Sequence, residues 1–70
     1  MWNKREAAAR RSRLALQREL RQCIHALQAN EAAFQQATDP CYIEQLIYQH
    51  AAELCRCRAV LRQLRTGGRP

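Results

Sequence analysis

A single helix-breaking segment, Thr38-Asp39-Pro40, interrupts a chain that otherwise favours helix from residue 4 to residue 65. The Asp39 carboxylate can accept a hydrogen bond from the unpaired backbone N–H groups that begin a helix. Pro40 suits the first helical position, because its φ is already helical and its missing N–H is not needed there. The sequence therefore predicts that one helix ends before Thr38 and that a second begins at Pro40.

Both glycines and the second proline lie at the C-terminal end of the chain. Gly67 and Gly68 follow the last apolar residue of the second segment and provide a left-handed stop. Ala, Leu, Gln, Arg and Glu dominate the residues between the breaks, whereas the β-branched residues that strands favour are few. We predict an all-α chain that forms a single domain, with helices over residues 4–36 and 40–65, a turn at 37–39, and frayed tails at 1–3 and 66–70.

The two predicted helices carry apolar residues at helical spacing. In the first, Leu20, Leu27 and Phe34 recur seven residues apart. In the second, the pattern alternates steps of four and three, which is typical of a coiled-coil seam; it comprises Ile43, Ile47, His50, Leu54, Cys57, Leu61 and Leu64.

A short connection makes neighbouring helices antiparallel, so the expected fold is an antiparallel two-helix hairpin. The numbers of facing residues should then sum to about 77, because the first helix ends and the second begins close to the turn. In this register Leu27 faces His50, Leu20 faces Cys57, and Cys23 lies near Leu54 and Cys55.

Some apolar residues of the second helix lie outside this predicted seam, and one partner helix cannot cover them all. They are Tyr42, Leu46, Tyr48, Ala52 and Val60. A chain of 70 residues also buries only a modest core. We therefore expect these five residues to form an interaction surface for a second copy or another protein, with two hairpins pairing into a four-helix bundle.

Charge is segregated along the chain. The first 21 residues hold seven basic and two acidic side chains, residues 22–55 hold four acids and no Lys or Arg, and residues 56–70 hold five arginines and no acid. A hairpin brings both basic segments to its open end and leaves the acids towards the turn. The chain thus becomes a charge dipole.

The basic end suggests an alternative function, the non-specific binding of nucleic acid or another polyanion through phosphate contacts. The side chains that would do so are Lys4, Arg5, Arg10, Arg11, Arg13, Arg18, Arg56, Arg58, Arg62 and Arg65. The competing interpretation is a solvated helical face without a ligand. Aromatic residues that could stack on bases are missing among these arginines.

The cysteines and His50 raise the question of a metal site. Side chains two positions apart on a helix point about 200° from each other, so Cys55 and Cys57 cannot hold one ion together. We therefore interpret cysteine as a small apolar residue, with His50 and Cys57 filling core positions. In that case His50→Leu should raise stability and Cys57→Ala should lower it by about 1 kcal/mol. A disulfide between Cys23 and Cys55 under oxidising conditions stays an open alternative.

Sequence signatures of catalysis are not found. The chain has no Ser/His/Asp set, no glycine-rich phosphate loop and no dinucleotide fingerprint, and a two-helix hairpin offers little concavity for a substrate. We expect a non-enzymatic protein without cofactor, metal or small-molecule substrate. No membrane span or secretion signal is recognisable, and the cysteines fit a reducing compartment, so we expect a cytoplasmic location.

One stretch of the chain resembles a known family. Phe34, then Asp39-Pro40, then Ile47-Tyr48, then Ala51-Ala52-Glu53 with Arg56 and a final leucine-rich turn, is similar to the YaaL-like family of short proteins from bacilli and clostridia. The resemblance covers residues 27–65. It implies a cytosolic helical hairpin from the Firmicutes and supplies no catalytic residues.

Overall fold

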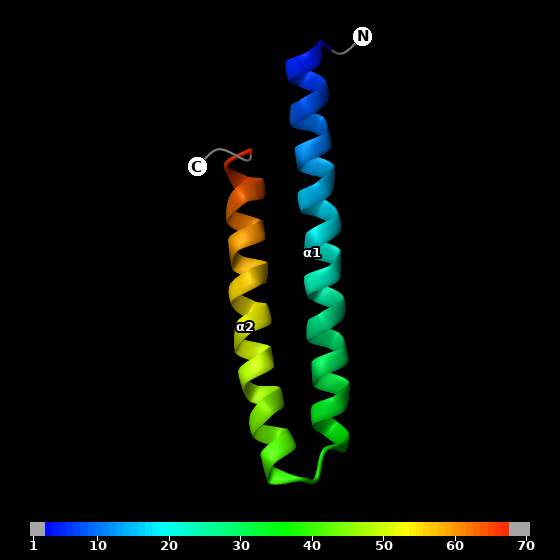
Figure 1. Ribbon diagram of the computed structural model, residues 1–70, viewed down its shortest axis with the longest axis vertical. Helices are drawn as coiled ribbons and strands as arrows, with labels where there is room; N and C mark the ends of the chain where they lie inside the picture. Colours follow the sequence, from blue (N-terminus) through cyan, green and yellow to red (C-terminus); the bar gives the residue numbers. More distant parts are fainter. Residues whose placement is uncertain (1–2, 68–70) are drawn as a thin grey trace.

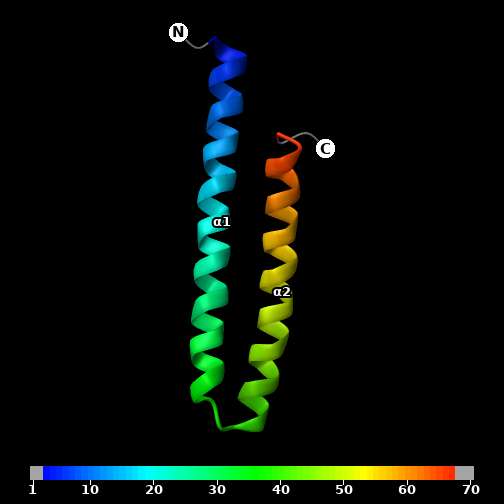
Figure 2. The same cartoon turned by 180° about the vertical axis from the view of Figure 1, so that it is seen from behind.

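Two antiparallel helices make up the fold. The computed structural model describes residues 3–67, within which α1 spans Lys4–Gln36 and α2 spans Pro40–Arg65. A short connection returns the chain beside itself, and the two helices run side by side from the turn upwards (Figures 1 and 2). The predicted all-α helical hairpin is confirmed, with both helices at the predicted bounds.

The first helix begins at a capping box. The Asn3 side chain accepts a hydrogen bond from the Glu6 backbone N–H at 2.7 Å, and the Glu6 carboxylate accepts one from the Asn3 backbone N–H at 3.4 Å. Residue 3 is therefore the cap of α1 rather than part of a frayed tail. Of the tails predicted at residues 1–3 and 66–70, residues 1–2 and 68–70 lie outside the described residues, and Thr66 is the C-terminal cap of α2.

The second helix has the caps that the sequence predicts. The Asp39 carboxylate accepts a hydrogen bond from the Tyr42 backbone N–H at 3.3 Å, and Pro40 occupies the first turn. At the other end Gly67 has a φ of +70° and its N–H donates to the Leu64 carbonyl at 3.3 Å. Glycine is suited to this left-handed conformation because it has no Cβ.

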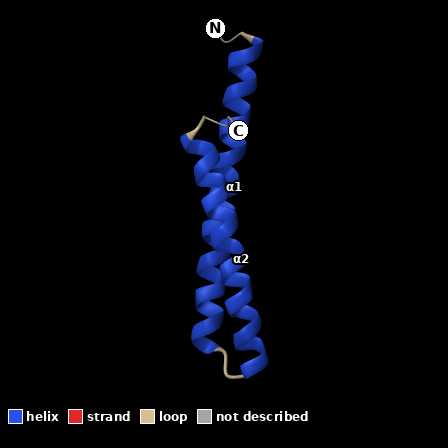
Figure 3. Ribbon diagram, turned by 90° about the vertical axis from the view of Figure 1, so that its left-hand side faces the viewer, coloured by secondary structure: helices blue, strands red, loops and turns tan. Residues whose placement is uncertain are grey.

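The hairpin is long and thin. Its extents are 55 × 21 × 13 Å. Because α1 has 33 residues and α2 has 26, the N-terminal part of α1 continues past the end of α2, as Figure 3 shows. This overhang has no neighbouring helix, which agrees with its composition of alanine and charged residues.

The core lies between the two helices and is small. Cys23, Cys57 and Val60 form its buried centre, against which leucines of both helices pack: Leu16, Leu20, Leu27 and Leu64. A fourth buried residue, Leu46, lies closer to the turn. Cys57 therefore fills a core position, as the sequence predicts.

The predicted seam of α2 is half wrong. Leu46 and Val60, expected on a free surface, are each only 3% exposed, whereas Ile47 and Leu61, expected in the seam, are 52% and 45% exposed. His50, expected to be in the core, is exposed as well. In the row of Cys57, Cys57 is buried and Ile43 and Leu64 are partly buried, as predicted. On the flank of that row, α1 covers Leu46 and Val60 instead of Ile47 and Leu61.

Polar contacts account for this rotation of α2. The Asn30 side-chain amide donates to the Leu46 carbonyl at 2.9 Å, and Arg56 of α2 forms an ion pair with Glu19 of α1 at 3.5 Å. Both contacts link the helices on the side where Leu46 and Val60 lie. They therefore favour burial of those two residues and leave Ile47 and Leu61 uncovered.

Candidate interaction surfaces

The polar side of the hairpin is defined by the contacts around Arg56. Its guanidinium reaches Glu19 at 3.5 Å, Glu53 at 3.4 Å and the Gln22 side-chain oxygen at 3.4 Å. These side chains are part-buried or exposed, so the contacts add more to the register of the helices than to their stability. On this side the guanidinium of Arg56 is thus engaged within the hairpin.

The opposite side, which we term the open apolar face, carries large apolar side chains that border the core and that no further element of the described chain covers. It is formed by Leu16, Ile24, Leu27 and Phe34 from α1 and Ile43, Ile47, Leu54 and Leu61 from α2. At about 100° per residue, these positions fall on one flank of each helix, and in an antiparallel pair the two flanks join into one surface. Four of the eight are about half exposed, namely Ile24, Phe34, Ile47 and Leu61.

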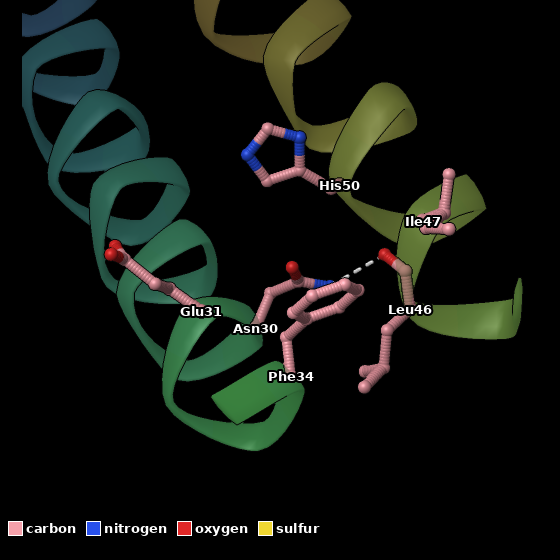
Figure 4. Close-up of a pocket in the computed structure, with 6 residues that line it drawn as sticks. All are labelled: Asn30, Glu31, Phe34, Leu46, Ile47 and His50. Atoms are coloured by element: carbon pink, nitrogen blue, oxygen red, sulfur yellow. Dashed lines mark hydrogen bonds between the residues drawn. The ribbon is translucent and has the colours of Figure 1, made fainter. Parts of the chain in front are cut away.

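Towards the turn, this face is hollowed. A shallow hollow of about 470 Å³ is lined by Phe34 and Glu31 of α1 and by Ile47 and His50 of α2. Figure 4 shows the Phe34 ring and the Asn30 amide projecting between the helices, with the dashed hydrogen bond from Asn30 to the Leu46 carbonyl behind them. The hollow is open to solvent, so it fits an inserting apolar side chain better than an enclosed small molecule.

The five residues predicted as an interaction surface do not lie together. Leu46 and Val60 are buried between the helices, which corrects their assignment to a free surface. Tyr48 is 67% exposed, with its hydroxyl donating to Glu44 at 3.5 Å, and Ala52 is also exposed. Tyr42 instead lines a hollow on the polar side, beside Gln49 and Glu53.

The sequence pattern did not predict the open apolar face, because two rows of apolar residues on α2 have the same spacing. Ile47 and Leu61 repeat at the same heptad interval as Leu46 and Val60, one position further on. Both rows flank Cys57, and the apolar pattern favoured the row of Ile47 and Leu61, because its middle position is Leu54 whereas that of the other row is Glu53. A sequence signal for the other row is Asn30, a polar residue within the apolar stripe of α1 whose side-chain amide donates to the Leu46 carbonyl.

The cysteine that lies beside Cys23 is not the one that the sequence register predicts. All four are free thiols. Cys23 is fully buried beside Cys57, whereas Cys55 is exposed. The neighbour of Cys23 across the helices is therefore Cys57 and not Cys55, which corrects the disulfide considered from the sequence. Burial raises the pKa of the Cys23 thiol, and the adjacent Cys57 thiol raises it further.

The spacing argument against a shared metal ion at Cys55 and Cys57 agrees with their positions. One side chain faces solvent and the other faces the core. Within residues 3–67, no group of three or more His, Cys, Asp or Glu side chains is placed to hold a metal ion.

Nine of the ten cationic residues predicted to bind polyanions form the basic end of the hairpin. All of them are exposed except Arg56, whose guanidinium contacts Glu19 and Glu53. The basic end is therefore formed by Lys4, Arg5, Arg10, Arg11, Arg13, Arg18, Arg58, Arg62 and Arg65. Since α1 extends past α2, its first residues lie on a single helix (Figure 1), whereas Arg58, Arg62 and Arg65 belong to α2, which runs beside α1.

The chain matches none of the protein-family models, none of the curated proteins and none of the solved structures with which it was compared. The resemblance to the YaaL-like family stays a prediction. Over the described part of the chain, neither helix contains a stretch long and apolar enough to cross a membrane.

Proposed function

We propose that this chain is a non-enzymatic helical interaction module, which uses its open apolar face to associate with another protein surface. One observation carries the proposal: large apolar side chains of both helices line a single face and are left about half exposed, most of all Ile47 at 52%. Scattered apolar residues are ordinary on protein surfaces, but a continuous apolar face is typical of a docking site.

The energetics support this assignment. Only four residues of the described chain are buried apolar residues, and two of them are cysteines. Covering apolar surface contributes about 25 cal/mol per Å², so a partner on the open apolar face would add substantially to the stability of so thin a hairpin. A reducing, cytosolic setting belongs to the proposal, because all four cysteines are free thiols.

Sedimentation equilibrium at tens of micromolar tests the self-associating form of this proposal. We expect a mass that is a multiple of 8.2 kDa. Replacing Ile47 and Leu61 together by Glu should return the protein to monomer with its helicity retained, because charged side chains cannot be buried unpaired. The matched control is Ala52→Glu on the outer surface of α2, which should leave assembly unchanged.

Two results would count against the proposal. Assembly that persists in the Ile47→Glu, Leu61→Glu variant would show that another surface associates. A fully helical 8.2 kDa monomer at every concentration would remove self-association and leave only a different protein as the partner.

A second candidate function, the non-specific binding of polyanions, is supported by the basic end. Its cationic side chains are all exposed, and the side chains of Arg58 and Arg62 make no hydrogen bond or ion pair within the described chain. Arginine suits phosphate contacts because its planar guanidinium donates two parallel hydrogen bonds. Titration of a generic duplex and a structured RNA at two salt concentrations checks this candidate. Binding should weaken steeply with salt, and no binding at low ionic strength would eliminate it.

A further inference from the structure

We propose that the occupant of the open apolar face is a second copy of this chain, packed so that the turns of the two hairpins lie at opposite ends. This inference rests on the proposed function, since it names the partner and its orientation. Its evidence is the combination of an apolar face shared by both helices with charges of opposite sign at the two ends of that face.

Two symmetric arrangements can cover the face. A two-fold axis parallel to the helices places both turns at the same end, and a two-fold axis across the helices places them at opposite ends. Either arrangement makes every helix antiparallel to its neighbours in a four-helix bundle. Packing of apolar side chains alone therefore does not distinguish them.

The charges on the two ends do distinguish them. Near the turn, Glu44 is exposed, and its carboxylate accepts one long hydrogen bond from the Tyr48 hydroxyl at 3.5 Å. Towards the open end of the same helix, Arg58 and Arg62 are exposed, and neither side chain has a hydrogen bond or ion pair within the described chain. By helical position, Glu44, Arg58 and Arg62 all border the open apolar face.

The register follows from the limits of the face. It extends from Phe34 and Ile43 near the turn to Leu16 and Leu61 near the open end, so a perpendicular two-fold axis at its centre makes facing α2 residues sum to about 104. Glu44 then lies level with residue 60 of the second copy, between its Arg58 and its Arg62. The symmetry repeats this contact at the other end of the dimer.

With both turns at the same end, like charges meet instead. The basic ends of two chains would lie together, as would their acidic turns, and juxtaposed like charges destabilise an interface. The net charge of +6 on each copy opposes association in both arrangements, so the distribution of charge decides the orientation. When the turns lie at opposite ends of the dimer, the acidic turn of each copy lies against the basic end of the other.

The size of the face fits a dimer of this kind. The apolar residues cover about 27 Å of helix, on a molecule 21 Å wide. The corresponding footprint is roughly 550 Å² on each copy, and the total of roughly 1,100 Å² lies at the lower end of specific interfaces. A dissociable dimer is therefore expected rather than an obligate one.

A distance measurement between the two turns tests the orientation. Thr38 is exposed in the turn and makes no side-chain hydrogen bond in the structure, so Thr38→Cys provides a position for a nitroxide label once the exposed Cys41 and Cys55 are replaced by Ser. Electron-electron double resonance on the dimer should give a separation of about 40 Å, because each Thr38 lies about 14 positions, or about 21 Å of helix, from the symmetry axis level with residue 52. A separation of about 15 Å, the spacing of neighbouring helices plus the label, would overturn the inference and leave the proposed function standing.

Charge reversal tests the named contact without a label. We expect Glu44→Arg and Arg58→Glu each to raise the dissociation constant of the dimer by about tenfold, since each change creates two repulsive contacts. The two variants alter the net charge in opposite senses, so a general charge effect cannot weaken both. The double variant has the net charge of the wild type and should recover most of the affinity.

Other outcomes overturn the inference in recognisable ways. A tighter dimer in Glu44→Arg would show that the acidic turns had been neighbours, as in the arrangement with turns at the same end. A helical monomer at every concentration would exclude a second copy as the occupant, while the proposed function would still have a different protein as its partner.

Discussion

At the scale of single residues, burial separates side chains of the same type. Cys57 is buried and Cys55 is exposed two positions away, and Leu46 is buried beside an exposed Ile47. His50 is exposed beside the apolar hollow, so the stabilisation expected of His50→Leu from a buried imidazole no longer applies to the hairpin. The cysteines therefore give the clearest tests of the core.

Cys57→Ala should lower the free energy of unfolding by about 1 kcal/mol, because it removes one buried heavy atom and leaves a small cavity. Cys55→Ala is the matched control, since the same atom is removed from an exposed position on the same helix. Urea unfolding followed by circular dichroism measures both. Equal effects of the two substitutions would contradict the assignment of Cys57 to the core.

Cys23 should make stability depend on pH in the alkaline range. Burial, followed by the neighbouring Cys57 thiol, raises the pKa of the Cys23 thiol in the folded protein. The unfolded chain ionises this thiol at about pH 8.5, so its contribution is complete below that pH and is lost as the pH rises towards the higher folded pKa. Urea unfolding between pH 7 and 10 should show this fall, and the fall should be smaller in Cys23→Ala. An unchanged slope in that variant would assign the effect to other groups.

At the scale of elements, local capping signals determine where the two helices begin and end. Polar contacts between the helices determine how α2 is rotated against α1. The caps at Asn3 and Asp39 and the left-handed Gly67 fix where α1 and α2 begin and end. Asn30 and Arg56 then link the helices along one side. A polar residue within an apolar seam commonly specifies register in this way.

Asp39→Ala should destabilise the hairpin by about 1 kcal/mol, the usual cost of losing an N-cap carboxylate. The hydrogen bond to the Tyr42 N–H is lost, and Pro40 alone is left to begin α2. Thr38→Ala serves as the control, because its side chain is exposed in the same turn. Thermal unfolding of the three proteins distinguishes the cap from the turn, and a similar loss in both variants would contradict a capping role.

At the scale of the whole molecule, a thin hairpin with an uncovered apolar face should gain stability by association. A tenfold increase in protein concentration should raise the unfolding temperature of the wild type by about 4 °C, because the folded dimer is favoured by mass action. The Ile47→Glu, Leu61→Glu variant should unfold at a temperature independent of concentration. Circular dichroism melts over a hundredfold range of concentration measure the effect. A wild-type midpoint independent of concentration would contradict self-association.

Local chemistry along the chain was enough to specify the helices. Asp39-Pro40 gave the start of α2, the glycine after residue 66 gave its end, and the short turn between them required an antiparallel pair. The segregation of charge could also be predicted, because a hairpin necessarily returns the C-terminal arginines to the N-terminal end.

The sequence could not decide which flank of α2 meets α1. The rows containing Leu46 and Val60 on one side and Ile47 and Leu61 on the other have the same heptad period. The first row also contains Glu53 and the second Leu54, so apolar content alone favours the row that the structure leaves exposed. The choice depends on contacts between residues far apart in the chain, namely Asn30 with the Leu46 carbonyl and Arg56 with Glu19. Those contacts exist only once the helices are packed, and they determine which apolar residues remain exposed for a partner.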